Sequence, residues 1–523
     1  MEITALADRV GGMLMIGFDG TTIHEAPAEL IADLGGAILF QRNLQDAEQT
    51  RALVDGLQAA RRSGAPPLLI AIDEEGGSVS RLRRFGTPKP SAMALGAAGD
   101  PSLTESVYAL SGDELASLGI NLNLAPVADV NSERLNPVIG IRSFGSQPDA
   151  VGRHVAAAIR GLRRSGIAST AKHFPGHGGT TVDSHVDLPV VVCDLEHLRA
   201  IELPPFRAAI DAGVDVVMTA HIAFPALDLS GLPATLSRKV VTGLLREELQ
   251  YDGIICTDCM QMNAVAARSS AAALAVKAAG AGVDLLVYSN SGDAHSARAA
   301  LRAAVLDETL DAKQVERSLA RVEALRSAVP NGARDANALH RIGSPAHRAQ
   351  SHDAALRGIT LVRDPGALVP LRAAAGERIL LVHFSGDASA PHGSAHTETA
   401  LGMALAAGPA RIQEQLRGID PAGHEYKQLL MAAGAAAAVV CVSYRAVTHP
   451  LQARAVADLA LIGKPVIVVM AREPYDIEVL PPEASIIAAY GDDDCTMSAV
   501  ADVLLGRAQA AGRLPVSFAD AVP

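Results

Sequence analysis

Short apolar segments alternate with helix-like segments through about the first 300 residues, and this alternation constrains the fold more than any other feature. The apolar segments have the length of buried strands and are bounded by turn residues, while the segments between them have the spacing of amphipathic helices. This order of elements is typical of parallel βαβ units. The predicted strands are Met13–Phe18, Gly36–Phe40, Leu68–Asp73, Asn121–Val130, Thr170–Phe174, Val214–His221, Gly253–Asp258 and Val283–Ser289.

The number of these strands favours a closed barrel. Eight strands within about 300 residues match the size of a (β/α)8 barrel, and an open doubly wound sheet is the structural alternative. The predicted helices between them are Asp46–Arg62, Leu103–Leu118, Ala150–Ser165, Leu195–Ala212 and Val240–Leu249.

Several of the predicted strands end in charged or imidazole side chains. A single such ending is unremarkable, because the chain emerges into solvent there. Barrel enzymes, however, build their active sites at the carboxyl ends of several strands, so a series of such endings favours the barrel and indicates a shared site. The endings are Asp73, Asp129, Lys172 with His173, His221 and Asp258.

A second, smaller domain follows the predicted barrel. Proline and glycine residues interrupt the helical pattern after the barrel, which indicates a linker. We therefore expect a barrel over residues 1–325, a linker over 326–355 and an α/β sandwich domain over 356–523, with a parallel sheet covered by helices on both faces. Its predicted strands are Arg378–Phe384, Ala437–Tyr444, Pro465–Ala471 and Ser485–Tyr490.

Charge and composition exclude several classes of protein. With 57 acidic and 45 basic side chains, the formal net charge is −12, which argues against nucleic-acid and anionic-membrane partners. No apolar run approaches the ~18 residues of a spanning helix. The N-terminal segment carries Glu2 and Asp8 where a signal peptide is positively charged, and five cysteines do not form a disulfide framework. We expect a cytoplasmic protein, whose oligomeric state the sequence does not determine.

The densest cluster of reactive side chains is the run KHFPGHGGTTVDSH, from Lys172 to His185, which leaves a predicted strand and enters a glycine-rich loop. Asp183 and His185 are separated by one residue, so the loop allows a hydrogen bond between the carboxylate and the imidazole. Such a dyad fixes the tautomer of the imidazole and raises its basicity, which suits a general acid/base near neutral pH.

A metal site is the alternative interpretation of this loop, because imidazoles and carboxylates are ligand types. The chain has neither an H-x-H pair after the first strand nor an H-E-x-x-H helix, so we expect no metal and no cofactor. The residues that the metal interpretation would use are His173, His177, Asp183, His185 and His221.

An acidic cluster follows the third predicted strand, in the run IDEEGGSVSR. Its carboxylates could bind the hydroxyl groups of a sugar, with Arg81 neutralising part of the charge, although a solvated acidic turn fits the same residues. Phosphate would be repelled by three carboxylates.

The run CTDC, from Cys256 to Cys259, admits a redox or zinc interpretation. It lacks a second cysteine pair, and Cys256 lies inside an apolar strand, where a free thiol packs as a small hydrophobic group. Asp258 is the more informative residue, because a carboxylate at the end of the seventh strand is placed to attack a ligand bound over the barrel.

The predicted site therefore contains carboxylates, an imidazole dyad and arginines, without a nucleotide fingerprint. Glycosyl transfer fits this set of groups, since a retaining glycosidase needs a carboxylate nucleophile and a separate proton donor.

The chain resembles the bacterial β-N-acetylglucosaminidases of glycoside hydrolase family 3. The resemblance rests on the motifs IDEEGGSVSRL, NLNLAPVADVN, NPVIGIRSFGS, AKHFPGHGGTTVDSHVDLP, VMTAHIAFPALD and ICTDCMQM, in the order of the family, and on the C-terminal run AVADVLLGRAQAAGRLPVSF. It covers nearly the whole chain, and KHFPGHG followed by DSH is the most specific part.

The resemblance implies roles for eight residues. Asp258, in the T-D motif, corresponds to the nucleophile, and His185 with Asp183 corresponds to an unusual acid/base in which an Asp holds a His. The sugar-binding positions implied by the family are Asp73, Arg81, Arg142, Lys172 and His173.

Departures from the family pattern concern the outer pocket. Ser78 stands where the family often has an arginine, and Ile141 stands where it often has an acidic residue. Gly179 replaces a common aspartate, and Cys259-Met260 replaces a common Asp-Leu pair. None of them removes a proposed catalytic group, but they leave the preferred leaving group undetermined.

The implied substrate is a short saccharide ending in N-acetylglucosamine, from cell-wall fragments or chitin oligomers. Aromatic residues make up 3% of the chain and Trp is absent, which argues against a long cleft lined with stacking platforms and favours an exo-acting enzyme. Three alternatives stay open: a phosphorylase that uses phosphate as the acceptor with the same residues, a metal-dependent hydrolase on the same barrel, and a non-catalytic sugar-binding protein.

Overall fold

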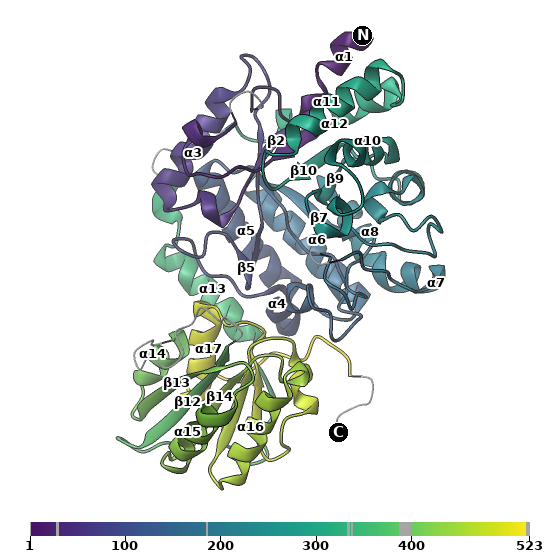
Figure 1. The fold of residues 1–523 in the computed structure, drawn as a ribbon. Coiled ribbons are helices and arrows are strands. Elements are labelled where there is room, and N and C mark those ends of the chain that lie inside the picture. Colours follow the sequence, from purple (N-terminus) through teal and green to yellow (C-terminus); the bar gives the residue numbers. More distant parts are fainter. Residues whose placement is uncertain are drawn as a thin grey trace.

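The computed structural model describes residues 2–27, 31–184, 187–331, 335, 338–385 and 399–518. The molecule is elongated, and its two main sheets lie in separate halves (Figure 1). The N-terminal part of the chain, purple to teal in Figure 1, forms the upper half, and the green-to-yellow part forms the lower half.

Eight parallel strands close into a barrel. The last strand pairs with the first, and every other strand pairs with the strand before and after it in this set. Each predicted strand segment overlaps one of them, which confirms the (β/α)8 barrel and rules out the open doubly wound sheet. The strands are β1 (Leu14–Ile16), β2 (Gly36–Leu39), β3 (Leu69–Ile72), β6 (Leu122–Asn123), β7 (Ala168–Phe174), β8 (Val216–Thr219), β9 (Ile254–Cys259) and β10 (Leu285–Tyr288).

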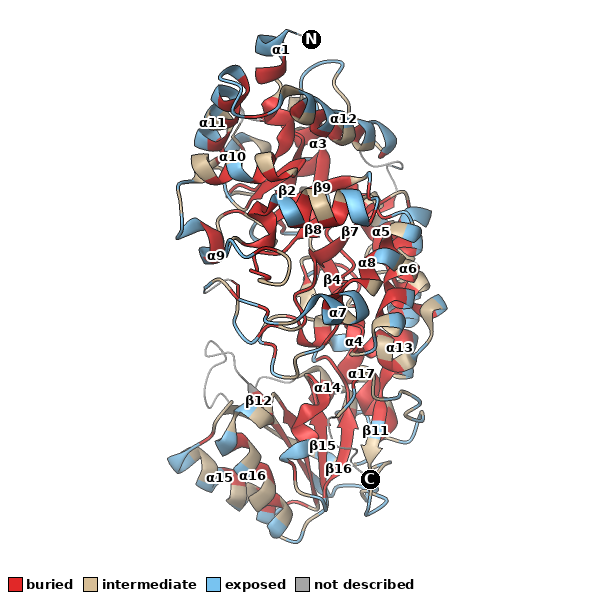
Figure 2. Ribbon diagram, turned by 90° about the vertical axis from the view of Figure 1, so that its right-hand side faces the viewer, coloured by how far each residue is buried: buried red, intermediate tan, exposed pale blue. Residues whose placement is uncertain are grey.

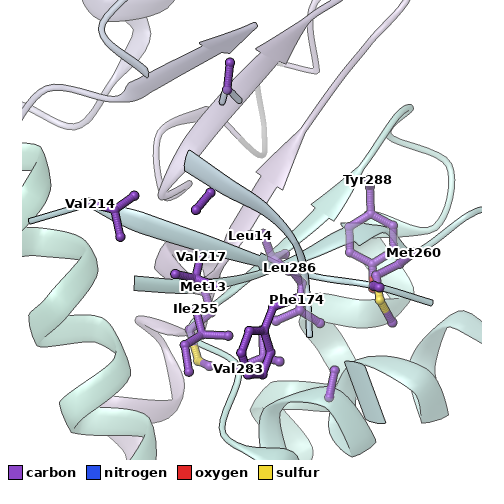
Figure 3. Packing of buried hydrophobic residues seen from close by; sticks show 14 of the residues in the cluster. Met13, Leu14, Phe174, Val214, Val217, Ile255, Met260, Val283, Leu286 and Tyr288 are labelled. Atoms are coloured by element: carbon purple, nitrogen blue, oxygen red, sulfur yellow. The ribbon is translucent and has the colours of Figure 1, made fainter. Parts of the chain in front are cut away.

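Side chains of each barrel strand alternate between the interior and the surrounding helices. In β1, Met15 packs in the interior cluster, whereas Leu14 and Ile16 belong to the layer between strands and helices. Figure 3 shows part of that outer layer, which includes Leu14 and Leu286 from the paired strands β1 and β10. Because apolar side chains fill the interior, a ligand can bind only at an end of the barrel. The interior cluster includes Met15, Ile38, Leu69, Leu122, Leu124, Val216, Met218, Ile254, Cys256, Leu285 and Val287.

Helices surround the barrel, and polar side chains mark where several of them begin. Asp46 and Asp100 each accept a hydrogen bond from a backbone N–H in the first turn of the following helix. The helices around the barrel include α3 (Ala47–Ala60), α5 (Pro101–Leu118), α6 (Pro148–Arg164), α8 (Pro204–Asp211), α10 (Ala271–Ala281), α11 (Ala294–Leu306) and α12 (Ala312–Ala328).

Two predicted helices differ from the structure. The segment predicted as one helix over Leu195–Ala212 is divided into α7 (Leu195–His197), the π-helical turn η5 (Leu198–Glu202) and α8. Pro204 explains the division, because proline has no N–H to continue a helix and is favoured in a first turn. The segment predicted over Val240–Leu249 is a π-helix, η7 (Lys239–Glu248).

The second sheet has six strands in the order β11-β16-β15-β14-β12-β13. The expectation of a parallel sheet is wrong at one edge, where β11 pairs antiparallel with β16. The helices packed with it include α14 (Ala400–Ala406), α15 (Gly423–Gly434), α16 (Pro450–Leu461) and α17 (Asp494–Leu504). The strands are β11 (Thr360–Arg363), β12 (Arg378–Ser385), β13 (Arg411–Gly418), β14 (Ala438–Ser443), β15 (Val466–Met470) and β16 (Ser485–Ala488).

The two strands that the sequence analysis did not predict are both edge strands. The central strands β14, β15 and β16 are buried along their whole length, so they appear in the sequence as continuous apolar runs. In contrast, β13 has the sequence RIQEQLRG and is only partly buried, and β11 is fully buried only at Thr360. An edge strand needs fewer apolar side chains, so its sequence signal is weak.

The two halves share apolar packing. Met93, Ala94 and Ala97 of α4 (Ala92–Ala98) pack in one cluster with apolar side chains of the second sheet. Figure 2 shows that the strands of both sheets are largely buried. Helix α13 (Pro345–Gly358) crosses residue 355, the predicted end of the linker, and the domain boundaries stay predictions. In the described part of the chain, no helix is both long and apolar enough to cross a membrane.

Candidate active site

A cavity of about 480 Å³ opens at the carboxyl ends of the barrel strands. Its position agrees with the strand-end rule for barrel enzymes. Six of the predicted site residues line it, and His185 lies outside the described residues. Asp183 is described and partly buried, and its neighbour Ser184 lines the cavity. The six lining residues are Asp73, Arg81, Arg142, Lys172, His173 and Asp258.

A chain of alternating charges forms one wall of the cavity. The Nζ atom of Lys172 lies 2.6 Å from Oε1 of Glu75 and 2.8 Å from Oδ1 of Asp73. Arg142 binds Glu75 through two hydrogen bonds of 2.8 Å, from Nε and Nη2. Arg81 continues the chain from the other side, with Nη2 3.3 Å from Oδ2 of Asp73. This bidentate and bridged geometry holds each head group in one orientation.

The same chain of charges favours the ionised forms of Asp73, Glu75 and Lys172. Burial raises the pKa of Asp73, but Lys172 and Arg81 outweigh it and hold this pKa below the ordinary value. Burial is likewise outweighed at Glu75, where Arg142 and Lys172 lower the pKa. Conversely, burial lowers the pKa of Lys172, and the two carboxylates raise it above its ordinary value. A polar ligand entering here therefore meets fixed ammonium, guanidinium and carboxylate groups.

A second carboxylate, Asp129, organises the imidazoles beside this wall. Its Oδ2 atom lies 2.7 Å from Nδ1 of His173, and its Oδ1 atom accepts the backbone N–H groups of His173 and His177. Because Asp129 takes Nδ1, the ring nitrogen of His173 that can face a ligand is Nε2. The ring of His177 is bound on both sides, by Oγ1 of Thr180 and Oγ of Ser184.

Asp258 is the penultimate residue of strand β9 and lines the cavity. Its Oδ1 atom accepts the backbone N–H of Cys259 at 2.7 Å. Burial raises its pKa, but the rings of His173 and His221 and the Cys259 N–H outweigh burial and hold the pKa below its ordinary value. The carboxylate is therefore ionised at neutral pH and able to act as a nucleophile.

The glycine-rich loop after β7 is fitted closely to its surroundings. A Cβ atom on Gly178 would lie 1.5 Å from the carbonyl oxygen of Val130, so only glycine fits there. The amide of Asn136 donates to the carbonyl oxygens of His177 and Gly178, at 2.9 Å each. These contacts determine the path of the loop toward Ser184 and the predicted acid/base dyad.

Three residues of the site were not among the predicted site residues. Glu75 lay in the acidic run but was not distinguished from its neighbour Glu74, and Asp129 was known only as a strand ending. His177 was considered only as a metal ligand. The signal for Asp129 and His177 was their position after a strand. For Glu75 the sequence carried no signal that would separate two adjacent acids.

The metal and redox interpretations concerned the imidazoles of the glycine-rich loop and the cysteines of the CTDC run. No group of three or more His, Cys, Asp or Glu side chains in that part of the chain is placed to hold a metal ion. Cys256 is buried in the barrel interior, Cys259 is partly exposed, and both are free thiols.

Comparisons with known proteins agree with this geometry. The family profile described as "Glycosyl hydrolase family 3 N terminal domain" matches residues 5–325, and that described as "Glycosyl hydrolase family 3 C-terminal domain" matches residues 359–523. The chain is 38% identical over 380 residues to a protein named beta-hexosaminidase A from Pseudoalteromonas piscicida. That alignment covers 67% of this chain and 63% of the relative.

Two solved structures illustrate the similarity in three dimensions. A glycoside hydrolase family 3 β-N-acetylglucosaminidase from Paenibacillus sp. str. FPU-7 superimposes with a TM-score of 0.88 at 38% identity, covering 98% of each chain. A β-glucoside phosphorylase superimposes with a TM-score of 0.82 at 21% identity, over 99% of this chain and 96% of the other. At that identity the second comparison shows a shared fold alone.

Proposed function

The chain belongs to glycoside hydrolase family 3, and from this premise we propose that it is a retaining, exo-acting β-N-acetylglucosaminidase. One observation supports the proposal above others: Asp258 is an ionised carboxylate inside the same cavity as the chain of charges from Arg81 to Arg142. A nucleophile beside a rigid set of hydrogen-bonding groups is what retaining glycosyl transfer requires.

We assign the nucleophilic role to Asp258. Its lowered pKa keeps the carboxylate unprotonated at neutral pH, so it can attack the anomeric carbon and form a covalent glycosyl-enzyme. The Cys259 N–H at 2.7 Å from Oδ1 restricts the rotation of the carboxylate and leaves Oδ2 for the attack.

The sugar is held by Asp73, Arg81, Arg142, Lys172 and His173. Each of the three cations is already paired with Asp73 or Glu75, so binding a neutral sugar leaves no isolated charge in the cavity. Nε2 of His173 is available to a hydroxyl group because Asp129 binds Nδ1. Apolar lining residues such as Phe40, Val138 and Met218 offer contact to carbon-bound faces of the ring and to a methyl group.

We assign the acid/base role to His185, with Asp183 as its partner. His185 protonates the leaving oxygen in the first step and activates the acceptor in the second, so the β-configuration is retained. Asp183 stabilises the imidazolium ion as it forms. The assignment rests on the DSH motif of the family and on Ser184, which stands between the two residues and lines the cavity.

The proposed substrate is a short saccharide with a terminal N-acetylglucosamine, derived from cell-wall fragments or chitin oligomers. The support is the small cavity, the absence of Trp, and the names of the relatives, a β-hexosaminidase and a β-N-acetylglucosaminidase. The volume of about 480 Å³ suits one sugar unit rather than a long chain. We also propose a cytoplasmic location, which the five free thiols support.

The decisive experiment is to analyse the products of the wild-type protein and to compare its turnover with that of the variant Asp258→Ala. The wild-type protein, incubated with a chromogenic β-N-acetylglucosaminide, should release free N-acetylglucosamine, and the variant should lose at least about 10³-fold in kcat while keeping its thermal midpoint. Near-normal turnover by the variant would contradict the nucleophile assignment.

The acceptor is determined by the same experiment in the presence of millimolar phosphate. Formation of a sugar 1-phosphate would show that the protein is a phosphorylase, which uses the same residues, and not a hydrolase. If activity disappeared on exhaustive chelation and returned with a divalent metal, both of these assignments would be wrong and the protein would be a metal-dependent hydrolase.

A further inference from the structure

The second domain contacts a segment of the barrel that carries active-site residues. This bridging segment, residues 131–145, follows the fourth barrel strand and includes Arg142, which lines the cavity. It lies between the turn η10 (Pro474–Glu478) of the second domain and the glycine-rich loop after β7, with polar contacts to both.

The contact next to Arg142 is made by Glu473, the residue before η10. Its Oε1 atom accepts the backbone N–H of Ile141 at 3.2 Å, although the two residues are 332 positions apart. A Cβ atom on Gly140 would lie 1.7 Å from the same Oε1 atom, so the chain approaches the carboxylate as closely as a glycine permits. Glu473 is 5% exposed, and it contacts the guanidinium groups of Arg445 and Arg472 at 3.6 Å each.

This contact is immediately next to a residue of the proposed sugar site. Ile141 precedes Arg142, which makes the bidentate pair with Glu75, and Glu75 in turn binds Lys172. A shift of the backbone at residue 141 therefore moves the guanidinium group of Arg142 within the cavity.

A second path leads from the same carboxylate to the glycine-rich loop. Arg445, paired with Glu473, donates to the carbonyl oxygens of Leu135 and Asn136 at 3.3 and 3.4 Å. The side chain of Asn136 donates to the carbonyl oxygens of His177 and Gly178. Asn136 thus links Arg445 of the second domain to the loop that carries Asp183.

We propose that Glu473 of the second domain is a positioning residue for the active site, which holds the bridging segment so that Arg142 faces the sugar and the glycine-rich loop keeps its path. This inference rests on the proposed function for its kinetic consequence. It assigns the second domain a part in substrate binding that is separate from stabilising the barrel. Glu473 contacts the residue before Arg142, and Arg445 and Asn136 connect it to the glycine-rich loop.

The test compares three full-length variants. Glu473→Ala removes the acceptor for Ile141 and the partner of Arg445, whereas Glu473→Gln keeps a carbonyl oxygen at the position of Oε1. Ser517→Ala is the matched control, because it removes another hydrogen bond between the two halves, from Nε2 of Gln147 at 2.9 Å, outside the bridging segment.

We expect KM for the chromogenic β-N-acetylglucosaminide to rise on the order of tenfold in Glu473→Ala, with a smaller change in kcat, and to return toward the wild-type value in Glu473→Gln. Ser517→Ala should leave KM unchanged. A fall in thermal midpoint with KM unchanged in Glu473→Ala would show a purely stabilising role and overturn the proposal.

Hydrogen exchange in the free protein gives a readout that does not depend on activity. Amides in residues 131–145 and 176–181 should exchange faster in Glu473→Ala than in the wild type or in Ser517→Ala. If the wild type cleaved no glycoside but these amides exchanged faster, the proposed function would fail while the positioning contact stood. Exchange unchanged at both segments would overturn the positioning contact itself.

Discussion

The carboxylate of Asp129 lies 2.7 Å from Nδ1 of His173 and is fully buried beneath the cavity. It also accepts two backbone N–H groups, so its position is determined by three donors. Burial raises the pKa of Asp129, but His173 and His177 outweigh it and hold the pKa below its ordinary value. His173 is thereby fixed with a defined ring nitrogen toward the cavity, and the proposed sugar site depends on a residue that does not line the cavity.

The first prediction concerns this pair. Asp129→Asn keeps an oxygen for the backbone donors but places an amide N–H₂ near Nδ1, which favours the other tautomer of His173. We expect kcat/KM to fall on the order of tenfold to a hundredfold, as for other residues that orient an imidazole. Steady-state kinetics measures the loss, and an unchanged kcat/KM at a normal thermal midpoint would contradict the role of the pair.

A second prediction separates two adjacent acids. Glu75→Gln weakens the pairs with Arg142 and Lys172, so KM should rise about tenfold or more, with a smaller effect on stability. Glu74→Gln removes the closest counterion of buried Lys89, at 2.8 Å, and should cost on the order of 3 kcal/mol of unfolding free energy. Kinetics and urea denaturation of both variants check this, and equal KM values would refute the division of roles.

The third prediction concerns His185, the proposed acid/base residue. His185→Ala should lose on the order of 10²- to 10⁴-fold in kcat with substrates whose leaving group needs a proton. The loss should shrink with a dinitrophenyl leaving group, because its departure needs no proton. A series of aryl glycosides with increasing leaving-group pKa measures the dependence. If the variant and the wild type responded to the series with the same slope, His185 would not be the acid.

A pH-dependent prediction follows from Glu202, a buried carboxyl group whose Oε1 accepts a hydrogen bond from Ser132 beneath the glycine-rich loop. Burial raises the pKa of Glu202 to about 8, and Asp129 adds to the effect. The unfolded chain releases this proton near pH 4.5, whereas the folded chain keeps it, so the folded state loses stability as pH rises toward 8.

Glu202→Gln removes this proton release. The thermal midpoint of the variant, relative to the wild type, should therefore increase from about pH 5 to pH 8 and then level off, with each pH unit contributing up to about 1.4 kcal/mol. Differential scanning calorimetry across this range tests the prediction. A difference that stays constant with pH would show that Glu202 ionises normally in the folded protein.

The fifth prediction compares two glycines. Gly178→Ala forces a Cβ atom against the carbonyl oxygen of Val130, so we expect a loss of about 2 kcal/mol or more in unfolding free energy, together with reduced activity. Gly243→Ala, in the π-helix η7, meets open space and should raise stability by up to about 1 kcal/mol. Urea denaturation of both variants gives the comparison, and similar effects would argue against close packing of the loop.

Much of the barrel could be predicted because its information is local. Each strand is a short apolar run, each helix has its own period, and the charged residue at a strand end is adjacent in sequence to the run that positions it. Asp73, Lys172, His173 and Asp258 were found in this way. The edge strands β11 and β13 were missed because a half-exposed strand has too few apolar residues to be distinguished from a loop.

The second acidic residue of the run, Glu75, illustrates the limit. Glu74 and Glu75 are neighbours in strand β4 (Glu74–Gly76), and successive side chains of a strand point to opposite sides. Glu74 turns to Lys89 and to the backbone N–H of Arg81, while Glu75 turns to Arg142 and the cavity. The register that decides between them is set by contacts with distant segments, so the local sequence is equally compatible with either.

The sequence by itself determined the barrel, the position of the site at its carboxyl end and most of the groups in it, because these follow from patterns within a few residues of one another. Only the tertiary structure decided which acid faces the cavity, that Asp129 fixes His173, and that Glu473 reaches a backbone amide 332 residues away. Such contacts form between segments that the chain brings together only when both halves are folded, and no local pattern records which donor will meet which acceptor.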